Sequence, residues 1–255
     1  MIRALDLTKR FENTNAVDHL TLTVEPGEIL GFLGPNGAGK STTVKMLTGM
    51  LQPTQGTAEI AGFDILKHPM EVKKRIGYIP ESGAMYDSLT PAEYLDFVAS
   101  LYHLDPKLAE SRFNDLLDIF GILHVKDQRL TELSKGMKQK VLISSAFIHR
   151  PDVIFLDEPL NGLDANAAMV VKELLKKLAA QGKTIFFCSH ILEVVERICT
   201  RIVIVDRGQQ IIAGTAQSIC EDTDSSSLED AFSRITGVRD VGDLSDYLLA
   251  ALERV

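Results

Sequence analysis

The fold of this chain is decided by one stretch, Gly34-Pro35-Asn36-Gly37-Ala38-Gly39-Lys40-Ser41-Thr42. A glycine, four further residues and then Gly-Lys-Ser form the pattern of a phosphate-binding loop. Residues 28–33 before it are predicted to form a short buried strand, and residues 41–50 after it a helix that ends at Gly49. A strand, a glycine-rich turn and a helix in this order indicate an α/β core.

The same stretch, called the phosphate loop below, has the chemistry to hold an anion. Glycines let the backbone curl closely around a phosphate, and the N–H groups face it together with the positive end of the following helix. Lys40 would reach the β- and γ-phosphates, and the Ser41 hydroxyl would bind Mg²⁺. The alternative is a plain turn with a solvated lysine. The predicted binding residues of the loop are Gly34, Asn36, Gly37, Gly39, Lys40, Ser41 and Thr42.

The composition is that of an ordinary globular protein, with 45% hydrophobic and 24% charged residues among 255. Its length suits one large domain or a domain with an inserted lobe. The net charge of −8 argues against a broad nucleic-acid-binding surface, so no nucleic-acid partner is expected. The three cysteines show no metal-ligand spacing, as expected of a reduced cytosolic chain. The apolar runs fall far short of the ~20 residues that span a membrane, so another polypeptide would supply any membrane part.

Apolar and alternating runs predict strands on both sides of a long helical block. Strands are expected over residues 2–9, 17–24, 57–60, 76–79, 153–156 and 184–188, with a hairpin over 201–205 and 210–212. Helices are expected over residues 69–75, 108–120, 133–149, 164–180, 191–198, 228–235 and 244–254, and from the capping box Thr90-Pro91-Ala92-Glu93. The predicted fold class is α/β: a phosphate-loop NTPase core with an antiparallel β subdomain and an inserted α-helical lobe of about residues 82–150.

Two acidic residues and a histidine follow the buried strands. Asp157 and Glu158 come directly after residues 153–156, at the edge where ligands bind in open α/β sheets. One carboxylate would coordinate Mg²⁺, and the other would polarise the water that attacks the γ-phosphate. A solvated acidic turn is the alternative. If residues 184–188 lie beside this strand, His190 comes near the γ-phosphate, although a lone histidine is more often structural or solvated.

Two other features each allow a structural and a functional interpretation. Ser134 is a natural N-cap for the helix that follows, and this role alone would explain it. Together with Gly136 and the helix N-terminus, however, it also forms an anion site. Phe11 lies between the first two strands, where spacing favours an aromatic of the core over a ring on which adenine stacks.

The order of the motifs along the chain is more specific than any one of them. After the phosphate loop and the helical lobe come Leu133-Ser134-Lys135-Gly136-Met137, Ile154-Phe155-Leu156-Asp157-Glu158-Pro159, Asn161-Gly162-Leu163-Asp164 and Cys188-Ser189-His190. This set, over roughly residues 1–215, resembles an ATP-binding cassette (ABC) transporter ATPase subunit. The Ser-Lys-Gly-Met form of the signature resembles the exporter-type subgroup. Residues 216–255 would then form a C-terminal helical tail.

The resemblance implies a role for each candidate residue. Lys40 and Ser41 hold the phosphates and Mg²⁺, Asp157 is the carboxylate linked to Mg²⁺, and Glu158 is the catalytic carboxylate. In the same family, Phe11 corresponds to an aromatic that stacks on adenine, His190 contacts the γ-phosphate, and Asp164 belongs to a loop that crosses to a second subunit. Ser134 and Gly136 complete the ATP site of the opposite subunit. The family therefore implies a dimer that encloses two ATP molecules with Mg²⁺, and a second copy of the chain is the expected partner.

The chain departs from the family pattern at two places. Lys135 and Met137 stand where glycine and glutamine are commonest, although Ser134 and Gly136 are kept. Glu81 stands where the family has a glutamine that senses Mg²⁺ and the attacking water. A carboxylate there could ligate Mg²⁺, but it adds a negative charge beside ATP and cannot donate a hydrogen bond unless protonated. Either Glu81 replaces the glutamine isosterically, or it alters turnover or metal dependence.

The resemblance implies an ATP-hydrolysing subunit that drives a separate integral membrane permease, in the direction of export. The chain would then work at the cytoplasmic face of the membrane, held there by its permease. Two alternatives stay open. One is a soluble ABC protein in a non-transport process, against which the acidic balance and the single cassette argue. The other is a regulatory ATP switch of low turnover, which Glu81 would favour.

Overall fold

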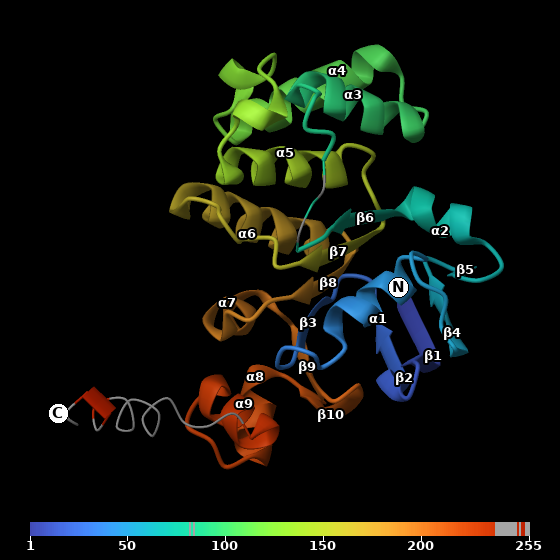
Figure 1. The fold of residues 1–255 in the computed structure, drawn as a ribbon, viewed down its shortest axis with the longest axis vertical. Helices are drawn as coiled ribbons and strands as arrows, with labels where there is room; N and C mark the ends of the chain where they lie inside the picture. Colours follow the sequence, from blue (N-terminus) through green and yellow to red (C-terminus); the bar gives the residue numbers. More distant parts are fainter. Residues whose placement is uncertain (82, 84, 238–248, 250, 253–255) are drawn as a thin grey trace.

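A computed structural model describes residues 1–81, 83, 85–237, 249, 251 and 252 (Figure 1). The strands form two sheets, one antiparallel with the order β2-β1-β4-β5 and one six-stranded with the order β10-β9-β3-β8-β7-β6. The antiparallel sheet confirms the predicted β subdomain. The strands are β1 (Ile2–Phe11), β2 (Thr14–Val24), β3 (Ile29–Leu33), β4 (Gln55–Ile60), β5 (Phe63–Asp64), β6 (Ile76–Ile79), β7 (Val153–Asp157), β8 (Thr184–Cys188), β9 (Arg201–Asp206) and β10 (Gln209–Gly214).

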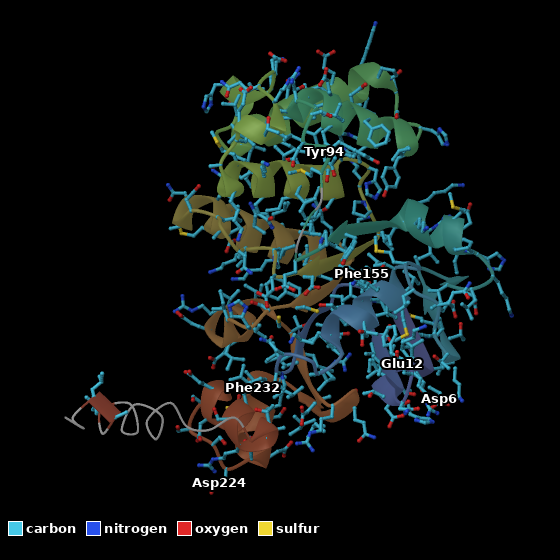
Figure 2. All side chains as sticks on the ribbon, viewed as in Figure 1. Asp6, Glu12, Tyr94, Phe155, Asp224 and Phe232 are labelled. Atoms are coloured by element: carbon cyan, nitrogen blue, oxygen red, sulfur yellow. The ribbon has the colours of Figure 1, made fainter. Side chains whose placement is uncertain are left out.

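The six-stranded sheet is parallel except at its β10 edge. Strand β3 pairs in parallel with β8 and β9, β7 pairs in parallel with β8 and β6, and β10 runs antiparallel to β9. Every residue of β3, β7 and β8 is buried, because a central parallel strand is covered on both faces. Phe155 of β7 lies in the middle of the molecule (Figure 2). The carboxyl ends of β3, β7 and β8 therefore lie at one edge of the sheet.

Successive residues of the central strands face two separate parts of the core. Phe186 of β8 packs with the cluster that includes β1, β2 and the helix after the phosphate loop. The next residue, Phe187, packs with the cluster that includes the helical lobe and the last helices. This is the two-residue period of a strand buried on both faces. The sheet thus holds the antiparallel subdomain and the helical lobe in one framework.

The helices fall into those that flank the sheet, the inserted lobe and the C-terminal pair. The lobe, α3 to α5, lies at one end of the molecule, and α8 and α9 lie at the other (Figure 1). None of the helices described here has the length and apolar character needed to cross a membrane. The helices are α1 (Lys40–Leu47), α2 (Pro69–Arg75), α3 (Pro91–Leu101), α4 (Pro106–Ile119), α5 (Lys135–Phe147), α6 (Ala165–Ala180), α7 (Leu192–Ile198), α8 (Ala216–Asp222) and α9 (Leu228–Thr236), with short 3₁₀ turns at Leu123–Val125 and Leu130–Glu132.

Each of the other predicted strands and helices up to residue 236 is present. The elements predicted over residues 69–75, 76–79 and 184–188 have the predicted ends, and the ends of the others are shifted. Strands β1 and β2 extend further than predicted, to Phe11 and from Thr14, because they pair with each other up to their connecting turn. The two-residue strand β5, the 3₁₀ turns and α8 as a separate helix were not predicted. Of the helix predicted over residues 244–254, only 249, 251 and 252 are described, and they are helical. The rest of that prediction lies outside the described residues.

The prediction that Phe11 is an aromatic of the core is wrong. Phe11 is 48% exposed at the end of β1, where the strand pairs with Thr14 beyond the packed core. The ammonium of Lys9 lies 5.3 Å from the centre of its ring. The ring is therefore available for contact with another group.

Candidate active site

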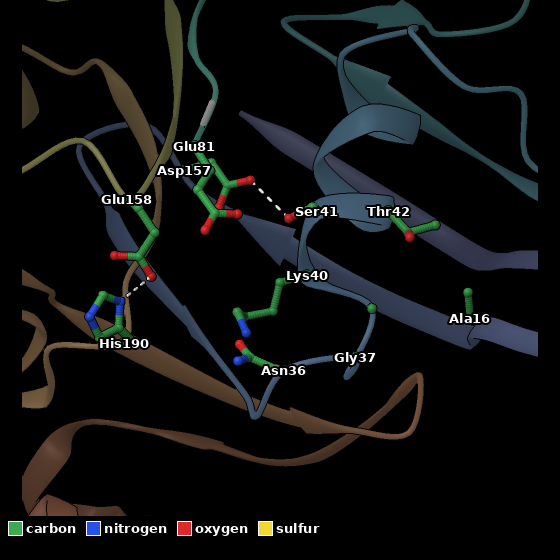
Figure 3. Close-up of a pocket in the computed structure, with 11 residues that line it drawn as sticks. Ala16, Asn36, Gly37, Lys40, Ser41, Thr42, Glu81, Asp157, Glu158 and His190 are labelled. Carbon is green, nitrogen blue, oxygen red and sulfur yellow. Dashed lines mark hydrogen bonds and ion pairs between the residues drawn. The ribbon is translucent and has the colours of Figure 1, made fainter. Parts of the chain in front are cut away.

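Most of the predicted site residues converge on a cavity of about 270 Å³ at the carboxyl edge of the six-stranded sheet (Figure 3). The phosphate loop and the start of α1 contribute one set of lining residues, and the carboxyl end of β7 with the residues that follow β6, β7 and β8 contributes another. Parallel strands end at the same edge, which is why side chains so distant in sequence meet here. The cavity is lined by Ala16, Asn36, Gly37, Gly39, Lys40, Ser41, Thr42, Glu81, Asp157, Glu158 and His190.

The phosphate loop leaves the first turn of α1 without a side-chain cap. Gly39 is the N-cap in the left-handed conformation, with φ at 101°, and no side chain hydrogen-bonds to the turn. A Cβ on Gly39 would lie 2.2 Å from the carbonyl oxygen of Ala16 in β2, so glycine is also required for packing. The first N–H groups of a helix have no partner within the helix. Here they face the cavity as donors for an anion.

Lys40 is held at the loop rather than extended. Its ammonium donates hydrogen bonds to the carbonyl oxygens of Gly34, at 2.6 Å, and Pro35, at 3.1 Å. Lys40 lines the cavity together with Asn36 and Gly37. The ammonium is thus positioned in the cavity by the backbone of the phosphate loop.

Ser41 and Asp157 are joined across the cavity. The Ser41 hydroxyl donates to Oδ2 of Asp157 at 3.0 Å. Burial raises the pKa of Asp157 above its usual value, and the nearby charges of Glu81 and Glu158 raise it further, while the Ser41 hydrogen bond opposes the shift. A carboxylate and a hydroxyl are oxygen ligands of the kind that Mg²⁺ prefers. The pair therefore fits a magnesium ion.

Within the part of the chain that the structure describes, the protein groups alone do not form a complete metal cage. Among the described residues, no group of three or more His, Cys, Asp or Glu side chains is placed to hold a metal ion. Mg²⁺ in nucleotide sites is usually bound by one or two carboxylates together with substrate phosphates. The arrangement of Ser41 and Asp157 matches that mode.

Glu158 is fixed by the two residues that follow β8. Its Oε1 lies 2.8 Å from Nδ1 of His190, and its Oε2 accepts a hydrogen bond of 3.3 Å from the Ser189 hydroxyl. The backbone N–H of Glu158 donates to the carbonyl of Cys188, and its φ of 51° lies in the left-handed region. That conformation is uncommon for glutamate and is found more often at functional sites. The carboxylate is buried and yet lines the cavity.

The segment Ser134–Met137, called the signature turn below, does not line this cavity in its own chain. The Ser134 side chain accepts a hydrogen bond from the Met137 N–H at 3.2 Å and caps α5, as predicted. A Cβ on Gly136 would lie 2.6 Å from the carbonyl oxygen of Gly162. Gln139, one turn further along α5, donates to the carbonyl of Pro159. The start of α5 is therefore packed against residues 159–162, directly after the strand that carries Asp157.

The structure brings together most of the predicted site and adds residues that were not predicted. Phe11, Gly34, Ser134 and Gly136 are absent from the lining of the cavity, whereas Ala16 belongs to it. Ser189 and Gln139 position the site without having been singled out. Ser189 lies between Cys188 and His190, so the Cys-Ser-His motif could have indicated that Ser189 belongs to the site. Nothing in the local sequence marks Ala16, which reaches the site through the pairing of β1 and β2.

Comparisons with known proteins give a consistent result. The profile of the family described as "ABC transporter" matches residues 17–161. The "ABC transporter ATP-binding protein NatA" of Bacillus subtilis is 39% identical over 238 residues, which cover 91% of this chain and 96% of that protein. The "Nod factor export ATP-binding protein I" of Burkholderia lata is 34% identical, with 85% and 71% covered. A solved structure described as "Structure of ATP binding subunit of ABC transporter" has a TM-score of 0.87 and 33% identity, with 92% and 99% covered.

Proposed function

This chain belongs to the family of ABC transporter ATP-binding proteins, and we propose that it hydrolyses ATP to drive export through a separate membrane permease. The observation that carries this proposal is the cavity at the sheet edge. There Lys40 and the uncapped turn of α1 face Asp157 and the fixed carboxylate of Glu158. We assign the ATPase to residues 1–215 and treat residues 216–255 as a C-terminal tail.

The roles of the residues follow from where each one is held. The phosphate loop and the Lys40 ammonium bind the phosphates, since both present N–H donors to the cavity. Ser41 and Asp157 hold Mg²⁺, with Glu81 as a further ligand, and the ion neutralises phosphate charge when bound. Glu158 accepts a proton from the attacking water, and His190 orients Glu158 and contacts the γ-phosphate.

We infer that the ATP site is completed by a second copy of the chain. Ser134 and Gly136 lie at the start of α5, whose N-terminus suits an anion, yet they do not line the cavity of their own chain. In a symmetric dimer each signature turn would face the phosphate loop of the other copy, with the loop at Asp164 crossing between them. Phe11, which is half-exposed beyond the phosphate loop, would stack on the adenine ring.

A second cavity suits the permease. It measures about 420 Å³ and lies between the helical lobe and β6, with a mainly apolar lining that includes Met50, Val98, Leu101 and Leu142. Met50 and Leu101 are each 61% exposed. Such a groove fits the apolar face of a helix from a partner. We propose that a cytoplasmic helix of the permease binds here, which would hold the chain at the cytoplasmic face of the membrane.

The groove can be tested separately from the ATP site. Leu101→Glu should abolish co-purification with the proposed membrane permease, because it places a charge in the apolar groove. ATPase activity of the isolated variant should stay near the wild-type rate. Leu108→Glu is the matched control, since Leu108 is also exposed but lies outside the groove. Loss of co-purification in both variants, or in neither, would exclude this groove as the permease site.

The proposed direction of transport rests on the comparisons and on the form of the signature turn. The name of the relative from Burkholderia lata includes export, and the Ser-Lys-Gly-Met form of the signature turn supports the same direction. Export is tested by reconstituting the chain with its permease in vesicles and following movement of substrate on addition of external ATP.

The ATPase assignment is tested by Glu158→Gln. This change keeps the side-chain shape but removes the base, so we expect ATP binding to persist and turnover to fall about a hundredfold or more. The variant should also accumulate as an ATP-bound dimer in light scattering. Glu196→Gln on α7 is the control for an exposed glutamate. Wild-type turnover in Glu158→Gln would show that the catalytic assignment is wrong.

A further inference from the structure

The cavity that must receive a polyanion carries an excess of negative charge among the described residues. The carboxylates of Glu81, Asp157 and Glu158 line it, against the ammonium of Lys40. In Figure 3 Glu81 and Asp157 stand next to each other and point toward Ser41. The two carboxylates therefore lie at the same part of the cavity.

The three carboxylates differ in how they are held. Asp157 accepts a hydrogen bond from Ser41, and Glu158 is bound by Ser189 and His190. Glu81 is exposed and makes no hydrogen bond or ion pair with any of the residues the structure describes. Its neutralisation would therefore remove a charge from the cavity without breaking a contact among those residues.

The negative charge of the cavity acts differently on a metal-free nucleotide and on a nucleotide with a bound metal ion. A metal ion cancels part of the phosphate charge and needs oxygen ligands from the protein. The described residues form no metal cage of their own. A bound ion would therefore take part of its oxygen ligands from the phosphates. A free carboxylate at the cavity edge repels bare phosphates and attracts the ion that accompanies them.

We propose that Glu81 makes nucleotide binding dependent on the divalent metal, by rejecting the metal-free nucleotide and favouring the metal complex. The proposal rests on the ATP-binding function of the cavity. A glutamine at this position has the same shape and no charge, so it supplies an oxygen ligand but no repulsion. Glu81 is thus a residue that selects between two forms of the same nucleotide.

The experiment compares the affinity of a non-hydrolysable ATP analogue, adenylyl-imidodiphosphate, in EDTA and in excess Mg²⁺ by calorimetry. Wild-type protein should bind the metal complex much more tightly than the metal-free analogue. In Glu81→Gln the metal-free affinity should rise roughly tenfold, about 1.4 kcal/mol, while the affinity for the metal complex changes less. By linkage, Mn²⁺ should bind more weakly to the variant's nucleotide complex, as measured by electron paramagnetic resonance.

Two control variants separate charge from shape and from overall charge. Glu81→Asp keeps the carboxylate on a shorter arm and should preserve the metal dependence. Glu110→Gln changes the net charge by the same amount, but Glu110 is exposed on α4 and lines none of the cavities described above. It should behave as the wild type. Circular dichroism confirms that each variant is folded.

Each outcome is decisive. An unchanged ratio of affinities in Glu81→Gln, or equal effects of Glu81→Asp and Glu81→Gln, would overturn the role of the Glu81 charge while leaving ATP binding intact. An equal shift in Glu110→Gln would assign the effect to net charge. If the wild-type protein bound neither form of the analogue, the proposed ATP-binding function itself would fail.

Discussion

The molecule contains two helix N-termini that are suited to bind a phosphate, and they differ in how complete they are. At α1 the N-cap is Gly39, which has no side chain to occupy the first turn. At α5 the N-cap is Ser134, whose hydroxyl accepts the hydrogen bond of the Met137 N–H. The first turn faces a cavity with carboxylates and a lysine, whereas the second lies outside that cavity. The first turn of α1 has no side-chain cap and faces a cavity of its own chain, whereas the first turn of α5 is capped by its own serine.

Gly37 in the phosphate loop and Gly136 in the signature turn are glycines for different reasons. Gly37 has a φ of 83°, and a Cβ added there would have no neighbour within 4 Å, so only its backbone conformation calls for glycine. A Cβ added to Gly136 would lie 2.6 Å from the Gly162 carbonyl oxygen, so packing of α5 calls for glycine there. Glycine is therefore required at Gly37 by the backbone conformation of the phosphate loop, and at Gly136 by the packing of α5.

The largest expected effect concerns the complete turn. Lys40→Ala removes the ammonium that lines the cavity beside the phosphate loop, and ATPase activity should fall about a hundredfold or more. Stability should change little, because the Lys40 ammonium bonds only to two carbonyls of that loop. Turnover and thermal unfolding measure the two effects. A variant that kept its turnover would show that the α1 turn is not the phosphate site.

Mixing two variant chains tests whether the signature turn of one copy completes the site of the other copy. Ser134→Glu puts a negative charge where a phosphate of the opposite chain would approach, so this variant should also lose activity. If each site combines Lys40 of one copy with Ser134 of the other, a mixed dimer of the two variants contains one intact site. An equal mixture that exchanges freely should regain about a quarter of the wild-type rate, since half the dimers are mixed.

The control for this mixing experiment is Lys40→Ala mixed with the double variant, which leaves no intact site in any dimer. Recovered ATPase activity is measured after the chains have been refolded together. No recovery in the first mixture, with dimers shown by light scattering, would contradict the assignment of the signature turn to the opposite site.

The fold could be predicted from sequence because its signals are local. Unbroken apolar runs identified β7 and β8, and the capping box at Thr90 and Glu93 is present as predicted at the start of α3. Two-residue β5 lacked such a signal, since so short a strand is defined by its partner β4. The exposure of Phe11 likewise depends on where β1 and β2 stop packing on the core, which local spacing does not show.

Only those site residues that belong to a sequence motif could be predicted. Asp157, Glu158 and His190 were placed correctly because parallel strands end at one edge. The left-handed backbone of Glu158 and the approach of Ala16 to Gly39 arise from contacts between distant segments, and no pattern in either segment indicates them. The roles assigned to these residues stay predictions until the variants are measured.

Gly136 and Gly37 should differ in what they contribute to stability and to ATP binding. Gly136→Ala should lower the free energy of unfolding by about 2 kcal/mol, because a backbone carbonyl cannot move away cheaply. Gly37→Ala should lower it by roughly 1 kcal/mol, through the left-handed backbone alone. Denaturant unfolding measures both. ATP affinity should show the opposite order, since Gly37 lines the cavity; equal effects on affinity would remove the distinction between the turns.

The smallest expected effect concerns the far end of α5, where His149 joins the helix to β6. Its Nε2 lies 2.9 Å from the Ile76 carbonyl and its ring stacks on Tyr102 with centroids 3.7 Å apart. Burial lowers the pKa of His149 to about 4 from its ordinary 6.5, and the Ile76 hydrogen bond opposes this only in part. The neutral ring therefore donates from Nε2 and anchors the helix that carries the signature turn.

The direction of the pH effect follows from proton binding. Between pH 6.5 and 4 the unfolded chain takes up a proton at His149 that the folded chain does not, so stability is full above pH 6.5 and is lost as the pH falls. From pH 8 to pH 5.5 the contribution should fall by about 1.4 kcal/mol. The difference in unfolding free energy between wild type and His149→Phe should shrink by that amount. His124→Gln, at an exposed histidine, should show no such change. A pH-independent difference for His149→Phe would mean that His149 does not hold α5 to β6 as a neutral donor.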